Sequence, residues 1–203
     1  MKTQKVTSGL TISLDGFAAG NNQTFESPFG DDFDSELLDC WMFTEPEKHH
    51  HTKEIEAILD AGAFIMGSNM FGPKDRRNSP EWKGWWGDNP PYHAPVFVLT
   101  HETRDPIEME GGTTFYFVTD GIESALSQAK KAAGDRDVKI MGGAKTINQY
   151  LKAGHIDELW LHIVPVTIGS GSRLFEDLPN LRLEPIEISG TSKVTHIRYT
   201  VSK

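Results

Sequence analysis

The stretch VKIMGGAKTINQYL, residues 138–151, decides the predicted fold of this chain. A run typical of a buried strand ends at two adjacent glycines, Gly142 and Gly143, and an amphipathic run typical of a helix follows. Glycines before a helix let a phosphate approach the backbone, where unpaired N–H groups and a partial positive charge favour an anion. A tight turn with close helix–sheet packing explains the same pattern, so the glycine pair alone leaves both interpretations open.

The same order of strand, glycine and helix recurs in FIMGSNMF, residues 64–71. Here Gly67 is followed by Ser68 and Asn69, which are both good helix N-caps. Two further predicted strands end at Thr100 and Thr119. Ligands in open α/β sheets bind at the carboxyl ends of parallel strands, so four such ends predict one elongated cleft that suits a dinucleotide.

The alternation of strands and helices along the middle of the chain predicts an α/β fold. We expect strands at 6–13, 63–67, 95–100, 114–119 and 138–143, and helices at 35–43, 53–62, 121–134 and 144–154. The segments 157–169 and 193–202 alternate like half-buried antiparallel strands, with 182–189 between them. The prediction is one domain over residues 1–203, with a mixed, mostly parallel sheet, helices on both faces and an antiparallel C-terminal edge.

Two details of the predicted helices can be checked in a structure. In the helix at 35–43 we expect Leu37, Leu38, Trp41 and Met42 to point inward. For the helix at 53–62, Gly62 is the expected C-terminal stop.

Composition limits the class of protein. The chain has 203 residues, a net charge of −9, 37% hydrophobic residues and one cysteine. The negative charge argues against nucleic-acid binding, although a small phosphorylated ligand needs only a local site. No apolar run approaches the length of a membrane span and no signal peptide is recognised, so we expect a cytoplasmic protein without a membrane partner.

Three other segments have competing interpretations. Asp15-Gly16 is either a simple turn or a mobile flap that carries a carboxylate and Phe17 to the cleft. The run His49–His51 suggests metal, but consecutive helical residues point about 100° apart and cannot converge on one ion. We therefore expect a solvent-exposed face and no metal site. The long segment 72–94, rich in proline and tryptophan, fits a cover for a planar ligand, a core plug or a dimer contact.

Four segments together resemble a known family: ISLDGFAAG, FIMGSNMF, VFVLTH and IMGGAKTINQYLKAGHIDELWLHIVPVTIGSGSRLF. Their order and spacing resemble the dihydrofolate reductase-like proteins that include the reductase domain of riboflavin biosynthesis, from about residue 5 to residue 200. The resemblance is closest to uncharacterised stand-alone members of that group.

The resemblance implies a reductase that uses NADPH and a dihydrofolate reductase-like fold. It implies three groups of cofactor-binding residues. The pyrophosphate and nicotinamide side would be held by Gly142, Gly143, Ala144, Lys145 and Thr146. The adenosine side would be held by Gly67, Ser68, Asn69, Met70, Thr100 and His101, with Thr119 beside it. The cover of the nicotinamide would include Leu14, Gly16, Phe17 and Ala19.

The chain departs from the family pattern in two places. The family usually has arginine where this chain has Ser68, and Thr or Ser where it has Met70; serine cannot replace a cation that binds phosphate. NADH therefore stays an alternative cofactor, and Arg76, Arg77 or Lys145 would be the substitutes for the missing cation. Glu36 and Asp39 lie where folate reductases carry their carboxylate, but no pattern selects one, so we do not expect folate reduction.

The expected reaction is hydride transfer to a small heterocyclic or ribosylamino-pyrimidine-like substrate, as in 5-amino-6-(5-phosphoribosylamino)uracil reductase. Asp15 is the predicted catalytic residue, as a substrate-orienting group or proton relay. The predicted ring pocket consists of Trp41, Phe71, Trp85 and Trp86. The alternative is a nucleotide-binding protein of the same fold without turnover. We also expect a homodimer through the C-terminal strands around Trp160, although these strands could simply close the core.

Overall fold

The computed structural model describes residues 3–202. Its strands are β1 (Val6–Ser13), β2 (Phe17–Ala19), β3 (Ala63–Gly67), β4 (Pro95–Leu99), β5 (Ile107–Glu108), β6 (Thr114–Val118), β7 (Val138–Gly142), β8 (Glu158–Val164), β9 (Ser172–Arg173), β10 (Arg182–Gly190) and β11 (Thr195–Ser202). Its helices are α1 (Glu36–Phe43), α2 (Thr52–Leu59), α3 (Ser68–Phe71), α4 (Ile122–Ala133) and α5 (Ala144–Lys152), with short 3₁₀ turns η1 (Glu47–His51) and η2 (Glu110–Gly112).

The strands form one nine-stranded sheet and a small two-stranded sheet. The large sheet has the order β10-β11-β8-β1-β7-β3-β4-β6-β5, and β2 pairs with β9. The strands from β8 to β6 in this order are parallel to one another, whereas β11 and β10 run antiparallel at one edge. The predicted mixed sheet with an antiparallel C-terminal edge is therefore confirmed.

One strand that was predicted to be antiparallel pairs in both directions. The alternating pattern of β8 predicts an antiparallel strand, but β8 pairs in parallel with β1 along seven residues. The reason is that α5 carries the chain back across the sheet, so β8 enters it from the same end as β7 and β1. Its antiparallel pairing is with β11 on the other side.

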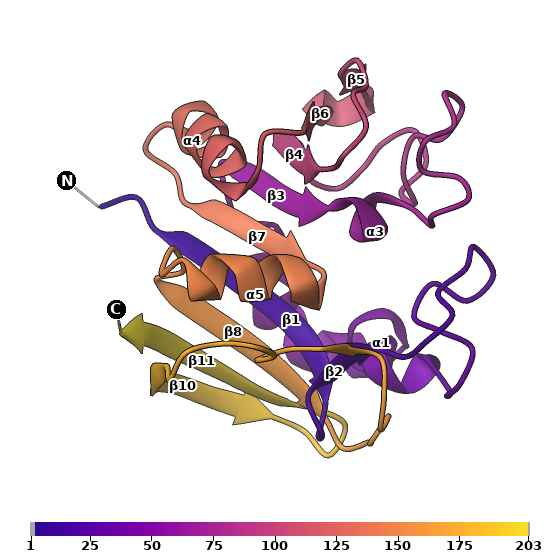
Figure 1. The fold of residues 1–203 in the computed structure, drawn as a ribbon. Helices are drawn as coiled ribbons and strands as arrows, with labels where there is room; N and C mark the ends of the chain where they lie inside the picture. The colour runs from indigo at the N-terminus through magenta and orange to yellow at the C-terminus, as the bar shows by residue number, and fades with distance from the viewer. Residues whose placement is uncertain (1–2, 203) are drawn as a thin grey trace.

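Helices cover both faces of the sheet (Figure 1). Apolar residues of α4 and α5 pack on β1, β3, β7 and β8 to form the largest core cluster. On the other face, Leu38 and Trp41 of α1 pack with Val164 and Val194. A third cluster, which includes Phe64, Phe71 and Phe115, lies under the segment 72–94, whose Trp82 and Trp86 pack against it.

Two details of the predicted helices are wrong. Leu37 of α1 is 43% exposed, because only Leu38 and Trp41 of that helix face the sheet fully. Helix α2 ends at Leu59 with Asp60 as its C-cap, so Gly62 does not stop it. Gly62 instead lies against the end of α4, where a Cβ would come within 2.7 Å of the Ala133 carbonyl oxygen.

Within residues 3–202, no helix combines the length and the apolar character that crossing a membrane requires.

Candidate functional site

Four parallel strands end in a row at one edge of the large sheet. β7, β3, β4 and β6 are consecutive neighbours, and Met66, Gly67 and Leu99 pair with Gly142, Leu99 and Val118 in turn. The residues that follow these ends, or lie at them, are the predicted Gly142, Gly67, Thr100 and Thr119. The structure thus brings together the four strand ends that the sequence singled out.

The Gly142-Gly143 step leaves the backbone open at the start of α5. Gly142 has a φ of 123°, in the region that favours glycine, and its peptide bond to Gly143 is cis. Gly143 is the N-cap of α5, and no side chain caps this helix end. Apart from its two chain neighbours, no heavy atom of residues 3–202 lies within 4 Å of a Cβ added at Gly143, so the space before the helix is open. These features suit a phosphate group, which binds helix N-termini through backbone N–H groups.

The strand-to-helix connection at Gly67 is in contact with the one at Gly142-Gly143. A Cβ on Gly67 would collide with Oγ1 of Thr146 on α5, and Met70 Sδ lies 3.8 Å from the Cβ position of Gly142. Ala144 and Thr146 are buried, whereas Lys145 is exposed. Residues predicted for the two ends of one cofactor are therefore in contact with each other.

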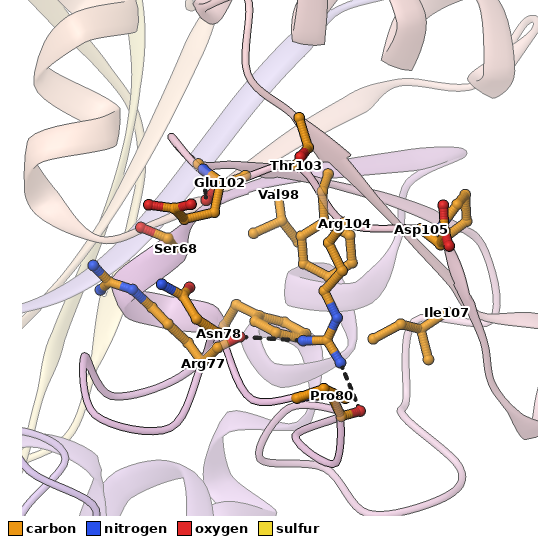
Figure 2. A pocket seen from close by; sticks show the side chains of 14 residues that line it. Ser68, Arg77, Asn78, Pro80, Val98, Glu102, Thr103, Arg104, Asp105 and Ile107 are labelled. Atoms are coloured by element: carbon orange, nitrogen blue, oxygen red, sulfur yellow. Dashed lines mark hydrogen bonds between the residues drawn. The ribbon is translucent and has the colours of Figure 1, made fainter.

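Ser68 and Asn69, although both are good N-cap residue types, do not cap α3. Gly67 itself is the N-cap of α3, and Ser68 and Asn69 lie inside the helix without a side-chain capping bond. The reason is that β3 runs directly into α3, so the glycine occupies the boundary position. Ser68 is left with its side chain directed toward the neighbouring cavity (Figure 2).

A cavity of about 470 Å³ lies beside α3 and the ends of β4 and β6. Of the predicted site residues, Ser68, Phe71 and Thr100 line it. Glu102 and the arginines Arg77 and Arg104 also line it, as Figure 2 shows, and of these three only Arg77 was predicted from the sequence, as one of three possible substitutes for the missing cation. Its size is within the range of small-molecule pockets.

The two arginines of this cavity have different surroundings. The Arg104 guanidinium donates to the carbonyl oxygens of Arg77 at 3.1 Å, Pro80 at 3.1 Å and Trp82 at 2.6 Å. Arg104 therefore fixes the path of the segment 77–82. The Arg77 guanidinium donates to Asn69 Oδ1 of α3, next to Ser68.

Arg76, Arg77 and Lys145 were predicted as possible replacements for the arginine that the family has at position 68. Of these three, Arg77 has the best position. Arg76 lies over the ring of Phe25, with its Cζ 3.8 Å from the ring centroid, and does not line the cavity. Lys145 is exposed on the first turn of α5. Arg77 lines the same cavity as Ser68, so it offers a positive charge close to where the family pattern has one.

The Asp15 carboxylate fixes a turn. Its Oδ1 accepts hydrogen bonds from Ser13 Oγ at 2.6 Å and the Ile168 N–H at 3.1 Å, and its Oδ2 accepts one from the Gly169 N–H at 2.7 Å. The Ser13 hydrogen bond is the main reason why the pKa of Asp15 lies below its ordinary value. A carboxyl group with a lowered pKa is a poor proton donor at neutral pH, which disfavours the predicted proton relay.

The turn that contains Asp15 is also held by a strand pair. β2 pairs with β9, and the Leu174 N–H donates to the Gly16 carbonyl oxygen at 2.9 Å. Leu14 is 69% exposed, Phe17 is half-buried and Ala19 is buried. The segment is therefore tied at both ends, which argues against the mobile-flap interpretation.

The predicted aromatic pocket is divided between several places. Phe71 lines the cavity. Trp41, on the side of α1 that faces the sheet, is fully buried, so the Trp41 ring is not open to a ligand. Trp85 stacks on Phe25 with centroids 5.7 Å apart, and Trp86 stacks on Phe115 at 5.9 Å. The packing of Trp86 favours the core-plug interpretation of the segment 72–94.

The histidine run is not uniformly solvent-exposed. His49 and His50 are exposed as expected, but His51 is 1% exposed and contacts His196, which is distant in sequence. The expectation failed because η1 ends at His51 and turns that side chain under α1. Asn148 was also missed: its side chain bonds the Arg173 carbonyl and the Phe175 N–H, and so fixes the segment 172–175 to α5.

Comparisons with known proteins agree with this geometry. The chain is 24% identical to the uncharacterised protein YyaP of Bacillus subtilis (strain 168) over 180 residues, which are 88% of this chain and 84% of YyaP. The fold is similar to that of a putative riboflavin biosynthesis protein from Shewanella sp. PV-4, with a TM-score of 0.69, 22% identity and coverage of 98% of this chain and 100% of that one.

Two further structures share the fold at lower identity. One is a diaminohydroxyphosphoribosylaminopyrimidine deaminase/5-amino-6-(5-phosphoribosylamino)uracil reductase from Thermotoga maritima, with a TM-score of 0.58, 14% identity and coverage of 98% of this chain and 57% of that one. The other is dihydrofolate reductase from Enterococcus faecalis in complex with NADP(H), with a TM-score of 0.54, 13% identity and full coverage of both chains. The fold is therefore dihydrofolate reductase-like. Residues 4–197 match the model of the RibD C-terminal domain, and the chain belongs to that family.

Proposed function

We propose that this protein is a reductase that uses NADPH to reduce a small heterocyclic substrate of the ribosylamino-pyrimidine kind. The observation that carries the proposal is the row of four parallel strand ends, with Gly67 and Gly143 on one surface next to the cavity of Ser68 and Arg77. Membership of the RibD C-terminal domain family supports the reductase class. The nicotinamide cofactor, when bound, supplies the hydride.

The chain's own residues would bind and orient the two reactants. The open backbone at Gly143 and the N-terminus of α5 would hold the pyrophosphate, because no side chain intervenes there. Arg77 would hold the phosphate that distinguishes NADPH from NADH, in place of the arginine that Ser68 replaces. A guanidinium forms paired hydrogen bonds with phosphate, so this contact would give the preference for NADPH.

A nucleotide-binding protein without turnover is the second candidate. The serine at position 68 favours it, because the family resemblance implies a ligand contact there. The burial of Trp41 also favours it, because this residue was predicted to line the ring pocket. Binding of NADPH without oxidation in the presence of ribosylamino-pyrimidine substrates would support this candidate over the reductase.

The experiment is a calorimetric titration of the purified protein with NADPH and NADH, followed by substrate-dependent oxidation of the preferred cofactor. We expect Arg77→Gln to weaken NADPH at least about 10-fold and to leave NADH within about 2-fold, since a bidentate phosphate contact contributes about 1.5–3 kcal/mol. Arg76→Gln is the matched control, because Arg76 lies on Phe25 outside the cavity.

A separate variant tests the proposed phosphate contact with the backbone at Gly143. Gly143 has a φ of −68°, so alanine fits the backbone there and its Cβ would enter only the free space before α5. We expect Gly143→Ala to weaken both cofactors while the protein stays folded. Unchanged affinity for both would show that the cofactor does not use this helix end.

We further propose a cytoplasmic homodimer. β10 is an edge strand with Ile186 and Ile188 exposed at 50% and 67%, which supports pairing of this edge with a second copy. Trp160 lies farther inside the sheet, with the Arg198 guanidinium 5.0 Å from its ring, so it would not be the centre of the contact.

A further inference from the structure

A buried group of metal-binding side chains lies away from the cofactor cleft, between the segment η1–α2 and the strand β11. It consists of His51, Glu54 and His196, which we call the histidine site. One donor atom from each of the three lies within 4.8 Å of the others. His51, Glu54 and His196 are 1%, 6% and 3% exposed, so the core of the protein holds all three.

The donor atoms are close to the spacing that one ion requires. His196 Nε2 and His51 Nδ1 are 2.8 Å apart. Around a tetrahedral zinc ion with bonds of about 2.0–2.2 Å, neighbouring ligand atoms are roughly 3.3–3.6 Å apart. The imidazoles would separate by about 0.5 Å and the Glu54 carboxylate would approach by about 1 Å, which small side-chain rotations allow.

Each of the three side chains has a second partner that orients it. His51 Nε2 faces Glu47 Oε1 at 3.3 Å, and His196 Nδ1 faces His162 Nδ1 at 2.7 Å. Ser189 Oγ donates to Glu54 Oε1 at 2.7 Å. Metal-binding histidines almost always use their other ring nitrogen in this way, which fixes the ring and its tautomer.

The protonation states also permit metal binding. If His51 donates from Nε2 to Glu47, its Nδ1 carries a lone pair toward the centre of the site. If His196 donates from Nδ1 to His162, its Nε2 carries a second lone pair toward the same point. Two neutral imidazoles and one carboxylate then face one centre. The present hydrogen bond between His51 and His196 places a proton on one of the two facing nitrogens, so when the ion binds, that ring changes tautomer and its proton moves to the other ring nitrogen.

The surroundings exclude bulk water but leave a little room. The indole of Trp41 packs against His51 and His196, with ring centroids 5.7 Å and 4.9 Å apart. A cavity of about 10 Å³ adjoins Glu54 and His162. That space is about what one water molecule needs, but neither His51 nor His196 lines it, so it does not place a fourth ligand on the ion.

We propose that His51 Nδ1, His196 Nε2 and the Glu54 carboxylate bind one divalent transition-metal ion, with Zn²⁺ as the preferred ion. Two imidazoles with one carboxylate is a ligand set that zinc uses, and imidazole suits this ion better than Mg²⁺ or Ca²⁺. The ion would connect α2 to the β10–β11 hairpin, which are far apart in the sequence. Its role is structural, because the site lies on the α1–α2 face, opposite α5 and its open N-terminus.

The test uses untagged protein, treated with a chelator, dialysed and titrated with ZnCl₂ by calorimetry, with the thermal midpoint recorded in parallel. We expect one Zn²⁺ per chain and a higher thermal midpoint with zinc. Glu54→Gln keeps the hydrogen bond to Ser189 and removes the charged ligand, and His196→Gln removes one imidazole. Each should weaken zinc at least about 10- to 100-fold.

The matched control is His49→Gln with His50→Gln, which removes the two exposed neighbours of His51 and should leave zinc affinity unchanged. Co²⁺ provides a second measurement that needs no comparison of stabilities: the wild-type complex should show the visible absorption of a tetrahedral ion, and Glu54→Gln should lose or shift it. Absence of stoichiometric zinc binding in folded wild-type protein would overturn the proposal. So would zinc binding that survives His196→Gln or that depends on His49 and His50.

Discussion

Lys139 offers a sharp test of the electrostatics of the core. It lies on β7 in the middle of the large sheet, and its ammonium group donates to the Ala57 carbonyl oxygen of α2. Burial, partly offset by the charge of Asp60, lowers the pKa of Lys139 from 10.5 to about 8. Keeping this lysine charged therefore lowers the free energy of unfolding of the protein.

The cost can be worked out from the two pKa values. A gap of about 2.5 between them corresponds to roughly 3 kcal/mol, since one pKa unit is about 1.4 kcal/mol. Lys139→Met removes this cost and also removes a hydrogen bond that contributes about 1 kcal/mol. At pH 7 we expect the variant to be about 2 kcal/mol more stable than the wild type.

The difference between the two proteins should depend on pH with a definite sign. Between about pH 8 and pH 10.5 the unfolded chain keeps a proton on Lys139 that the folded chain has released. The free energy of unfolding of the wild type therefore rises with pH in this window, and the advantage of the variant disappears.

Urea denaturation of both proteins at pH 7, 8, 9 and 10 measures this effect, because shared titrations cancel in the comparison. Lys130→Met, on the exposed side of α4, is the control and should show no such trend. A difference between Lys139→Met and wild type that does not change with pH would refute the reasoning.

Two other variants test contacts that stabilise the fold. Burial opposes the ionisation of Glu158, but hydrogen bonds from Lys5 and Arg198 outweigh it and lower its pKa. Glu158→Gln should cost about 1–2 kcal/mol at pH 7 by urea denaturation, and this loss should vanish as the pH falls below the usual range of a glutamate, where the wild-type carboxyl is also neutral. Asn148→Ala should cost about 1–2 kcal/mol and speed hydrogen exchange in residues 173–175, because both of its hydrogen bonds go to that segment.

The main features of the fold could be predicted because they depend on local patterns. Strands β3 and β7 and helices α4 and α5 are each apolar or amphipathic runs bounded by glycine, and their alternation leads to parallel pairing. The direction of β8 could not be predicted from its own alternation, since both of its edges are paired, one in each direction.

The candidate site was predictable at its backbone and less so at its side chains. Gly67 and Gly142 are recognisable because a Cβ at Gly67 would collide with Thr146 Oγ1 and because Gly142 has a φ of 123°. Arg77 was only one of three candidate cations, because a loop without periodicity gives no information on where its side chains point. Its position depends on Arg104, which binds three carbonyl oxygens of that loop.

His51 shows the limit of reasoning from local spacing. Consecutive helical residues cannot share one ion, and that argument still holds for His49–His51. One member of the run, His51, nevertheless contacts a histidine from a distant strand, His196 of β11. The burial of His51 depends on Trp41 of α1 and on the β10–β11 hairpin, and neither is encoded next to it in the sequence.

The same dependence on distant contacts gives the proposed preference for NADPH a physical basis. In the family pattern the cation stands on the first turn after the β3 glycine, whereas here Arg77 comes from the segment 72–94 and lines the same cavity as Ser68. Its position therefore depends on the packing of that segment, through Trp86 against Phe115 and through the carbonyl bonds of Arg104. Changes that loosen this packing should weaken NADPH more than NADH, because the proposed pyrophosphate site at Gly143 lies at the β7–α5 step, outside the loop.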